Sequence, residues 1–275
     1  MSLQPHIKRV AIVGVGLIGA SFGLALRKAG FGGSIVGVSS PRSIAAGKER
    51  GAIEAGITLE EAASSSDLIF LSQPIHGIIE TLNQLEVLKP RRPVITDAGS
   101  TKVAIENAAL AYLRDCPFVG GHPMAGKEQR GAEAADADLF QGRPWILTSF
   151  RDHPIEVELR SWIAKFGARI LVKDAATHDR LVAWSSHLPQ LASTALAAAL
   201  QESQPLAASV AGPGLADMTR LAMSSYDLWR DIVDTNQVEI AAALDTYIEK
   251  LQNLRANLDA EFAIGADFAQ SVRRP

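Results

Sequence analysis

A single histidine, His122, stands in a glycine-rich turn, Gly120–Gly126, that also contains a proline. Glycines let a backbone approach a ligand closely, and proline stiffens the turn. A neutral imidazole held in such a turn can accept a proton near neutral pH. The alternative is a tight turn with a solvated histidine, because histidine is often a surface residue. His122 is therefore a candidate general base, and the turn alone favours neither interpretation.

A second glycine-rich segment, Gly-Val-Gly-Leu-Ile-Gly, occupies residues 14–19. It follows a predicted strand and begins a predicted helix, which is the context of a dinucleotide-binding loop. The first glycine allows the tight turn, the second admits the pyrophosphate, and the third permits close helix–strand packing. The helix N-terminus favours the phosphate charge. We therefore expect a cofactor-binding site that includes Gly14, Gly16, Leu17, Ile18 and Gly19.

The segment after the second predicted strand bears on which nicotinamide nucleotide is bound. NAD enzymes commonly carry a carboxylate there for the ribose 2′-hydroxyl. This chain instead has two serines, Ser39 and Ser40, followed by a proline and Arg42. Hydroxyl groups and a guanidinium suit a 2′-phosphate. An ordinary Ser-Pro turn with a solvated arginine is the alternative. The sequence favours NADP as cofactor and leaves NAD open.

Two more segments follow predicted strands and should lie at the carboxyl edge of a parallel sheet, where ligands bind in such folds. At one of them we expect Ser72 and Pro74 to contact the nicotinamide side of the cofactor; a plain strand-to-helix turn is the alternative. At the other, Ser100 precedes His122 by one strand–helix unit, so both could meet at the nicotinamide. The alternative role of Ser100 is a helix N-cap.

Short apolar runs alternate with helical patterns through the first half of the chain. Strands are predicted at residues 9–14, 34–38, 67–71, 93–97, 118–120, 145–148 and 168–172, and helices at 17–28, 43–50, 75–88 and 155–166. Such alternation predicts a parallel sheet with helices on both faces. Beyond residue 173 only helical patterns remain, at 175–201, with an interruption at Pro189, and at 238–262. We expect an α/β protein with a Rossmann-type parallel-sheet domain (1–173), followed by an all-helical dimerisation domain (174–275).

Composition narrows the class of protein. Of the 275 residues 47% are apolar and 21% are charged, which suits a sizeable core. The net charge of −3 and the lack of a long basic run argue against nucleic acid as a partner. The single cysteine, Cys116, excludes an internal disulfide and a cysteine-based zinc site. No apolar run reaches the roughly 20 residues that span a bilayer, and residues 1–6 lack signal-peptide features. We expect a cytoplasmic protein without metal or membrane partner.

Further motifs lie in the helical half: His178-Asp179, Ser186-His187-Leu188-Pro189, Asp217–Arg220 and Trp229–Ile232. Together with Gly14–Gly19, Asp97–Lys102 and Gly120–Gly126, in this order and at compatible spacing, they make the chain resemble the prephenate/arogenate dehydrogenases of tyrosine biosynthesis over nearly its full length. The resemblance implies an oxidative decarboxylation. A hydride leaves C4 of a cyclohexadienol ring for the nicotinamide, the hydroxyl loses its proton, the ring carboxylate leaves as CO₂, and the ring becomes aromatic.

The same resemblance implies roles for individual residues. His122 accepts the hydrogen bond or proton of the substrate hydroxyl, and Ser100 orients both. Arg220 binds a substrate carboxylate through its two-pronged guanidinium; an ion pair with Asp217 is the alternative. Trp229 corresponds to the family aromatic that lines the pocket of the neighbouring subunit, which implies a homodimer; a core tryptophan is the alternative.

Two positions bear on the substrate. Many family members read Ser-His-Leu-Pro-His, but this chain has Gln190 in place of the second histidine, which is thought to contact the substrate side chain. Glutamine is neutral and offers no charge to the amine of arogenate. We therefore expect prephenate, with arogenate left open. His187 lies nine residues after His178, on nearly the opposite face of a straight helix. It can contact the substrate only if Pro189 or packing bends that helix.

Two other classes of protein share parts of this pattern. One is an NADP-linked dehydrogenase of the β-hydroxyacid type, which places a catalytic lysine on the interdomain helix; residues 181–200 contain no lysine. The other is a non-catalytic nucleotide-binding module, which would need no coincidence of Ser100, His122 and Arg220. Turnover of prephenate with a nicotinamide cofactor distinguishes the expected enzyme from both.

Overall fold

The computed structural model describes residues 7–90, 93–113, 116–148 and 154–273. The expected absence of a signal peptide concerns residues outside these ranges. The chain forms two compact units. Unit 1 comprises Met1–Asp179 and Tyr226–Thr235, and unit 2 comprises Arg180–Ser225 and Asn236–Pro275.

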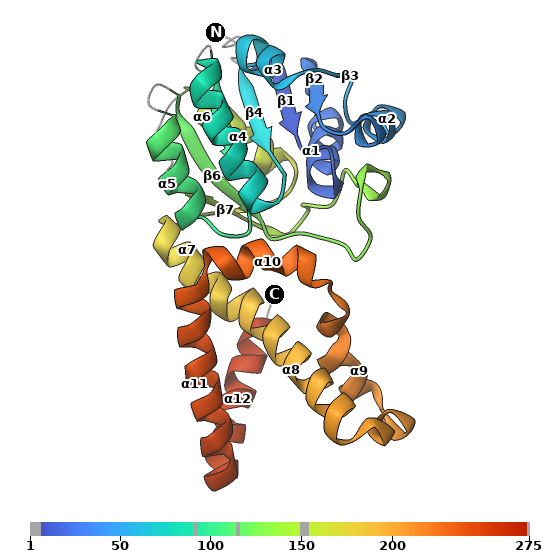
Figure 1. Cartoon of the computed structure of the whole chain (residues 1–275), viewed down its shortest axis with the longest axis vertical. Helices are drawn as coiled ribbons and strands as arrows, with labels where there is room; N and C mark the ends of the chain where they lie inside the picture. The colour runs from blue at the N-terminus through green and yellow to red at the C-terminus, as the bar shows by residue number, and fades with distance from the viewer. Residues whose placement is uncertain (1–6, 91–92, 114–115, 149–153, 274–275) are drawn as a thin grey trace. The chain divides into compact units, whose positions relative to one another are not determined.

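Unit 1 is built on an eight-stranded sheet of order β3-β2-β1-β4-β5-β6-β7-β8 (Figure 1). Its strands are β1 (Arg9–Val13), β2 (Ser34–Val38), β3 (Ala55–Gly56), β4 (Leu68–Leu71), β5 (Val94–Asp97), β6 (Phe118–Pro123), β7 (Pro144–Thr148) and β8 (Arg169–Val172). All neighbouring strands pair in parallel except β6 and β7. The predicted α/β class with an N-terminal Rossmann-type sheet is confirmed.

Strand β7 is the exception in the predicted parallel sheet, because it runs antiparallel to β6. A parallel neighbour needs a crossover connection, usually a helix. The connection from β6 to β7 contains only a single 3₁₀ turn, Ala132–Ala134. The chain therefore returns beside β6 in the opposite direction, and the parallel pattern resumes at β8 after a helix.

Helices cover both faces of the sheet. They are α1 (Leu17–Lys28), α2 (Pro41–Glu49), α3 (Leu59–Ser65), α4 (Ile75–Leu88), α5 (Val103–Tyr112) and α6 (Pro154–Lys165). Side chains of α1 and α6 join one apolar cluster with the strand residues Val10 and Ile12. Those of α3, α4 and α5 join a second cluster with Ala11 and Val13. This alternation along β1 shows that its two faces lie in different cores, as the period of a strand requires.

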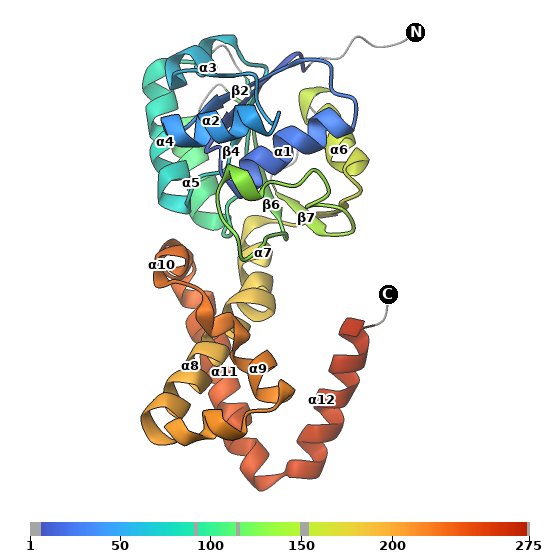
Figure 2. The ribbon, with the colours of Figure 1, turned by 90° about the vertical axis from the view of Figure 1, so that its right-hand side faces the viewer.

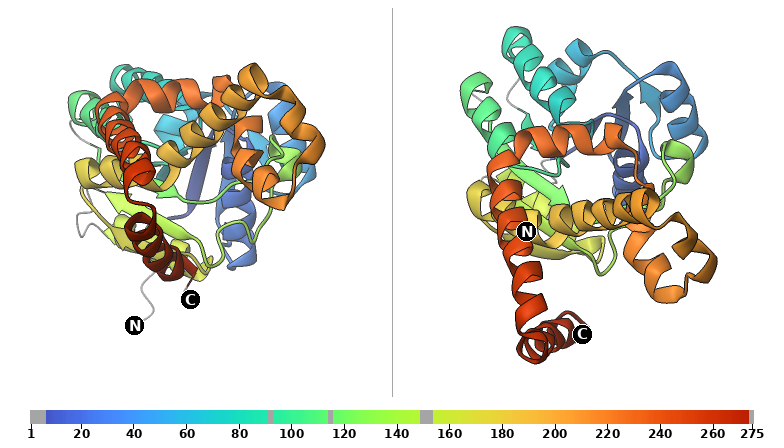
Figure 3. Two further views of the ribbon diagram at one scale, coloured as in Figure 1. Left: turned by 90° about the horizontal axis from the view of Figure 1, so that it is seen from below. Right: turned by 60° about the horizontal axis from the view of Figure 1, so that its bottom comes forward.

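One helix from the second half of the chain belongs to unit 1. Helix α10 (Tyr226–Thr235) buries Ile232 in the cluster formed by α4 and α5. The amide of His76, in the first turn of α4, donates to Oδ2 of Asp231 at 3.0 Å. The hydroxyls of Thr101 and Thr235 lie 2.7 Å apart. Figures 2 and 3 show α10 beside these segments.

Unit 2 is helical. Helix α7 (Ala175–Val182) enters it and continues through a π-helical turn, Ala183–His187, into α8 (Leu188–Ser203). Proline has no amide hydrogen, and the wider turn that precedes Pro189 accommodates the missing bond. The 3₁₀ turn Pro205–Val210, helix α9 (Pro213–Thr219) and the 3₁₀ turn Arg220–Met223 follow. The expected helical second half is confirmed.

The long helix predicted at residues 238–262 is two helices, α11 (Gln237–Ala256) and α12 (Leu258–Arg273). The backbone of Asn257 is non-helical, with φ −138° and ψ 59°, so the prediction of one continuous helix is wrong. Helix α12 reverses direction at the end of α11 and diverges from it (Figure 2), and near the turn Lys250 forms an ion pair with Glu261 at 2.9 Å. Within the described ranges, no helix combines the length and apolar character that a membrane crossing requires.

Candidate active site

The loop between β1 and α1 has the geometry of a dinucleotide cradle. Gly14 has φ +94°, and a Cβ atom there would lie 2.8 Å from the backbone of Ser72. A Cβ atom at Gly19 would lie 2.3 Å from the carbonyl oxygen of Gly14. Gly16 faces open space, and no side chain caps the first turn of α1. Gly14 and Gly19 thus permit close packing, while Gly16 leaves the helix N-terminus accessible to a phosphate.

Other predicted cofactor residues surround this loop. Leu17 and Ile18 form the first turn of α1 and pack against the first apolar cluster. Ser72 follows β4, and its hydroxyl donates to the carbonyl oxygen of Gly14 at 2.8 Å. Ser72 therefore supports the glycine loop. Pro74 immediately precedes α4.

The predicted 2′-phosphate residues lie at the beginning of α2. The Ser40 hydroxyl is the N-cap of this helix and accepts the amide of Ser43 at 3.3 Å. Ser39 is exposed. The Arg42 side chain is 90% exposed and lies 3.7 Å from the carboxylate of Glu133. These groups are open to a ligand, and Ser40 already stabilises the helix.

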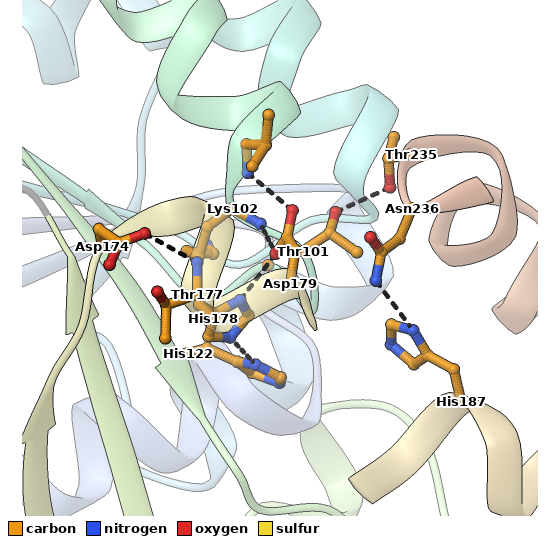
Figure 4. Close-up of polar contacts among 12 residues, drawn as sticks. Thr101, Lys102, His122, Asp174, Thr177, His178, Asp179, His187, Thr235 and Asn236 are labelled. Carbon is orange, nitrogen blue, oxygen red and sulfur yellow. Dashed lines mark hydrogen bonds and ion pairs between the residues drawn. The ribbon is translucent and has the colours of Figure 1, made fainter. Parts of the chain in front are cut away.

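His122 belongs to a chain of three buried side chains in unit 1 (Figure 4). Its Nδ1 lies 2.9 Å from Nε2 of His178, and Nδ1 of His178 lies 2.7 Å from Oδ1 of Asp179. A carboxylate only accepts hydrogen bonds, so Nδ1 of His178 carries a proton. In the neutral state Nε2 of His178 then accepts from Nδ1 of His122. With Nδ1 protonated, Nε2 is the basic nitrogen of the His122 ring.

Asp179 also fixes the segment that carries Ser100. Its Oδ1 accepts the amide of Lys102 at 2.7 Å, and its Oδ2 accepts the amide of Val103 at 2.9 Å. This carboxylate thus caps α5 from a position far along the chain. Ser100 lies half-buried two residues before the N-cap, so it does not fill the capping role considered for it.

A buried ion pair lies between the segment that carries Ser100 and the segment that carries His122. Lys102 Nζ bonds to Oδ2 of Asp97, and both side chains are fully buried. Burial raises the pKa of Asp97 above its ordinary value, and the Lys102 ammonium and the amides of Gly121 and Gly99 oppose that rise. Within the described residues no group of His, Cys, Asp or Glu side chains is arranged to hold a metal ion.

The predicted residues of unit 2 form a separate network. Gln190, which is 5% exposed, donates through Nε2 to the carbonyl oxygen of Leu221 at 2.8 Å and to Thr194 Oγ1 at 3.2 Å. The Ser193 hydroxyl accepts the amide of Ala222 at 3.1 Å. Helix α8 therefore holds the 3₁₀ turn that begins with Arg220.

Arg220 and His187 occupy contrasting surroundings in this unit. Arg220 is exposed, and among the described residues it forms no ion pair with Asp217, the alternative considered for it. His187 ends the π-helical turn, is buried, and its Nδ1 lies 3.2 Å from Nδ2 of Asn236. Trp229 lies in unit 1, half-buried against the second apolar cluster.

Sequence reasoning assigned no role to Asp97, Lys102, His178, Asp179 or Asn236. The sequence does show that His178 and Asp179 are adjacent at the beginning of a helix. It also shows that Asp97 and Lys102 are five residues apart. These patterns name candidates, but they do not reveal which residue each side chain contacts.

Comparisons with known proteins agree with this geometry. The nucleotide-binding domain of prephenate dehydrogenase matches residues 22–172, and the prephenate dehydrogenase dimerization domain matches residues 174–263. Prephenate dehydrogenases of Lactococcus lactis and Bacillus subtilis are each 30% identical over 92% of this chain, covering 70% and 71% of the relatives.

Solved structures are similar over almost the whole chain. Prephenate dehydrogenase from A. aeolicus, in complex with hydroxyphenyl propionate and NAD+, has a TM-score of 0.85 at 29% identity, with 99% of this chain and 98% of that chain covered. Synechocystis arogenate dehydrogenase has a TM-score of 0.78 at 30% identity, with 96% of each chain covered. The dinucleotide cradle, the His122–His178–Asp179 chain and these matches lead to one conclusion: the chain belongs to the prephenate dehydrogenase family of NAD(P)-dependent oxidoreductases.

Proposed function

We propose that the protein converts prephenate to 4-hydroxyphenylpyruvate with hydride transfer to NADP. The observation that carries this proposal is the hydrogen-bonded chain from His122 through His178 to Asp179, in the unit that also holds the glycine loop. A histidine whose tautomer is fixed through one ring nitrogen can serve as the base that the oxidation of a ring hydroxyl requires. The names of the Lactococcus and Bacillus relatives support the same reaction.

The chain's own residues supply proton handling and orientation. Nε2 of His122 accepts the C4 hydroxyl proton as the C–O bond gains carbonyl character, and returns it to the phenol oxygen after the ring becomes aromatic. His178 and Asp179 stabilise the transient imidazolium by accepting and relaying its hydrogen bond. Ser100 orients His122 and the hydroxyl. The bound nicotinamide supplies the hydride acceptor, and the carboxylate lost from the ring leaves as CO₂.

Arg220 is the proposed substrate-binding cation. Its guanidinium is exposed and suits a bidentate contact with a carboxylate. Gln190 supports the turn from which Arg220 projects and brings no acidic group that would pair with an amine. This favours prephenate over arogenate. Arogenate is the second candidate substrate, because the similar Synechocystis structure is an arogenate dehydrogenase. His187 is proposed as a further substrate-binding residue, and Trp229 as the aromatic residue that lines the substrate pocket of the neighbouring subunit.

The preference for NADP is proposed on the absence of a carboxylate after β2 and on the exposed groups of Ser39 and Arg42. Gly14, Gly16 and Gly19 would hold the pyrophosphate, and Ser72 and Pro74 lie beside that loop. NAD remains the second candidate, since the similar A. aeolicus structure contains NAD+. Values of kcat/KM for prephenate and arogenate, each with NAD and NADP, test the proposal. Absence of turnover in all four pairings contradicts it.

We also propose a cytoplasmic homodimer formed through the helical domain, with the domain boundary at 173/174. Helix α12 exposes five large apolar side chains along its length, Leu258, Phe262, Ile264, Phe268 and Val272. Exposed apolar surface of this extent marks an interaction site, and the matched domain is a dimerization domain. A molar mass measured by light scattering distinguishes a dimer from a monomer of 29.3 kDa.

A further inference from the structure

Lys102 and Asp97 form an ion pair that no step of the proposed reaction uses. Both side chains have 0% exposure, so neither reaches substrate or solvent. Burying an ion pair costs more free energy than burying an apolar pair of similar volume, unless all the hydrogen-bonding groups of the two ions have partners. The other hydrogen bonds of these two side chains show which parts of the backbone the ion pair fixes in place.

The other hydrogen bonds of the two side chains are made to backbone groups next to Ser100 or His122. The Asp97 carboxylate accepts the amide of Gly99 at 2.7 Å and the amide of Gly121 at 2.9 Å. Lys102 Nζ donates to the carbonyl oxygen of Gly121 at 2.9 Å. Gly99 immediately precedes Ser100, and Gly121 immediately precedes His122. The pair therefore joins the two segments that carry the proposed chemistry.

The sheet itself does not make this connection. Strand β5 pairs with β6 only at Ile95↔Phe118 and Thr96↔Val119. From Gly120 onward, β6 pairs with β7 instead. Where the β5–β6 ladder ends, side-chain bonds from Asp97 and Lys102 take its place. Their geometry, rather than the strand register, sets the spacing between β5 and the His122 segment.

Lys102 reaches His122 by a second route. Its backbone amide donates to Asp179, Asp179 bonds to His178, and His178 bonds to His122. One route runs through the Lys102 side chain to Gly121. The other runs from the Lys102 main chain through Asp179 and His178 to the imidazole of His122 (Figure 4). The contacts form a closed ring around Lys102. Lys102 thus holds the backbone of Gly121 directly, and it holds Nδ1 of His122 through Asp179 and His178.

We propose that Lys102, paired with Asp97, is a positioning residue that holds Ser100 and His122 at a fixed separation and keeps the His122 ring in one tautomer. This rests on the proposed function for its kinetic consequence. The positioning itself is a property of the protein without substrate. A residue that supplied stability alone would affect the amount of folded enzyme but not the turnover of each folded molecule.

The test uses the double variant Asp97→Asn/Lys102→Met, which removes both charges together and leaves no unpaired buried ion. We expect NADPH binding within about three-fold of wild type and kcat at least about ten-fold lower per NADPH-binding site, with little change in the KM for prephenate. The matched control is Glu61→Gln, which breaks the exposed Arg9–Glu61 ion pair at the amino end of β1. This control should retain wild-type kcat.

Turnover of the folded double variant within about two-fold of wild type would overturn the proposal. If the double variant does not fold, Lys102→Arg keeps the charge but changes the shape of the donor. It should show the same fall in kcat, and wild-type turnover in this variant also overturns the proposal.

A readout without activity separates this inference from the proposed function. Imidazole nitrogen NMR of the protein should show His122 and His178 as single Nδ1-protonated tautomers in wild type. His122 should become a tautomer mixture in the variant that folds. An unchanged His122 signal rejects the positioning role, whatever the activity. Absence of wild-type turnover together with the expected NMR change rejects the proposed reaction and supports the positioning role.

Discussion

Nδ1 of His122 lies 2.9 Å from Nε2 of His178, whose other ring nitrogen contacts the carboxylate of Asp179. The relationship has a direction, because a carboxylate can only accept. It assigns a proton to Nδ1 of each ring and leaves Nε2 of His122 as the basic atom. The same carboxylate caps the helix that follows Ser100. Two proposed catalytic residues are therefore oriented by one side chain.

Asp179→Asn should lower kcat by about 100-fold or more, because an amide can donate to His178 and reverse both tautomers. Loss of one of the two bonds to α5 should cost only about 1 kcal/mol of folding free energy. Steady-state kinetics with prephenate, alongside thermal unfolding, checks both effects. The control Asp174→Asn, at the beginning of the same helix, keeps an oxygen for the amide of Thr177 and should leave kcat unchanged. Equal kinetics in the two variants would refute the tautomer assignment.

Gln190→Leu should raise the KM for prephenate by about ten-fold, equivalent to about 1.4 kcal/mol, with a smaller effect on kcat. The variant loses the bond to Leu221 and loosens the turn that begins with Arg220. Thr194→Val removes the other acceptor of the same amide and leaves the bond to Leu221 in place, so its KM should stay close to wild type.

Arg220→Ala should raise the KM in the same direction as Gln190→Leu, with NADPH binding retained. If Gln190 acts through Arg220, the double variant should be no worse than Arg220→Ala alone. Additive effects on the KM would instead show that Gln190 contacts the substrate independently.

Ser39→Asp should shift the ratio of kcat/KM values toward NAD, because a carboxylate repels a 2′-phosphate and binds a 2′-hydroxyl. Arg42→Gln should weaken use of NADP by about ten-fold and leave use of NAD nearly unchanged. Lys48→Gln, in the last turn of the same helix, is the charge-matched control. A cofactor ratio that is the same in all three variants would place the 2′ position elsewhere.

Asp136 gives a prediction about pH. A hydrogen bond from Lys127 and one from the amide of Asp138 lower the pKa of Asp136 below its ordinary value of 3.8. A lowered folded-state pKa contributes stability above the unfolded value, and this contribution disappears as the pH falls through the folded value. Asp136→Asn should therefore reduce the urea midpoint more at about pH 7 than at about pH 3. An equal reduction at both pH values would show that charge is not the cause.

Regular elements were predictable where packing and local chemistry agree. The helices Leu17–Lys28 and Ile75–Leu88 and the strand Ser34–Val38 match their predicted bounds, because apolar spacing and turn residues give the same boundaries. The short helices α3 and α5 were not predicted. The N-terminus of α5 is capped by Asp179, a residue 76 positions away from Val103, which no local pattern can reveal.

The candidate site was predictable as a set of residues but not as a set of contacts. The glycines of the dinucleotide-binding loop are identifiable because the backbone conformation and close packing at these positions exclude residues with a side chain. The function of Lys102 depends on where β6 leaves β5, and that depends on the antiparallel return of β7. Which strand pairs with β6 depends on the path of the chain between the strands. The contacts of the Asp97–Lys102 ion pair therefore could not be predicted from the spacing of residues in the sequence.

The most direct test of the central claim is the formation of reduced nicotinamide by wild type and His122→Asn, measured with prephenate and NADP. We expect turnover by wild type and a loss of at least about 100-fold in kcat in the variant, with NADPH binding retained, since the contact of His122 Nε2 belongs to the transition state. Full kcat in His122→Asn would contradict the assignment of the base.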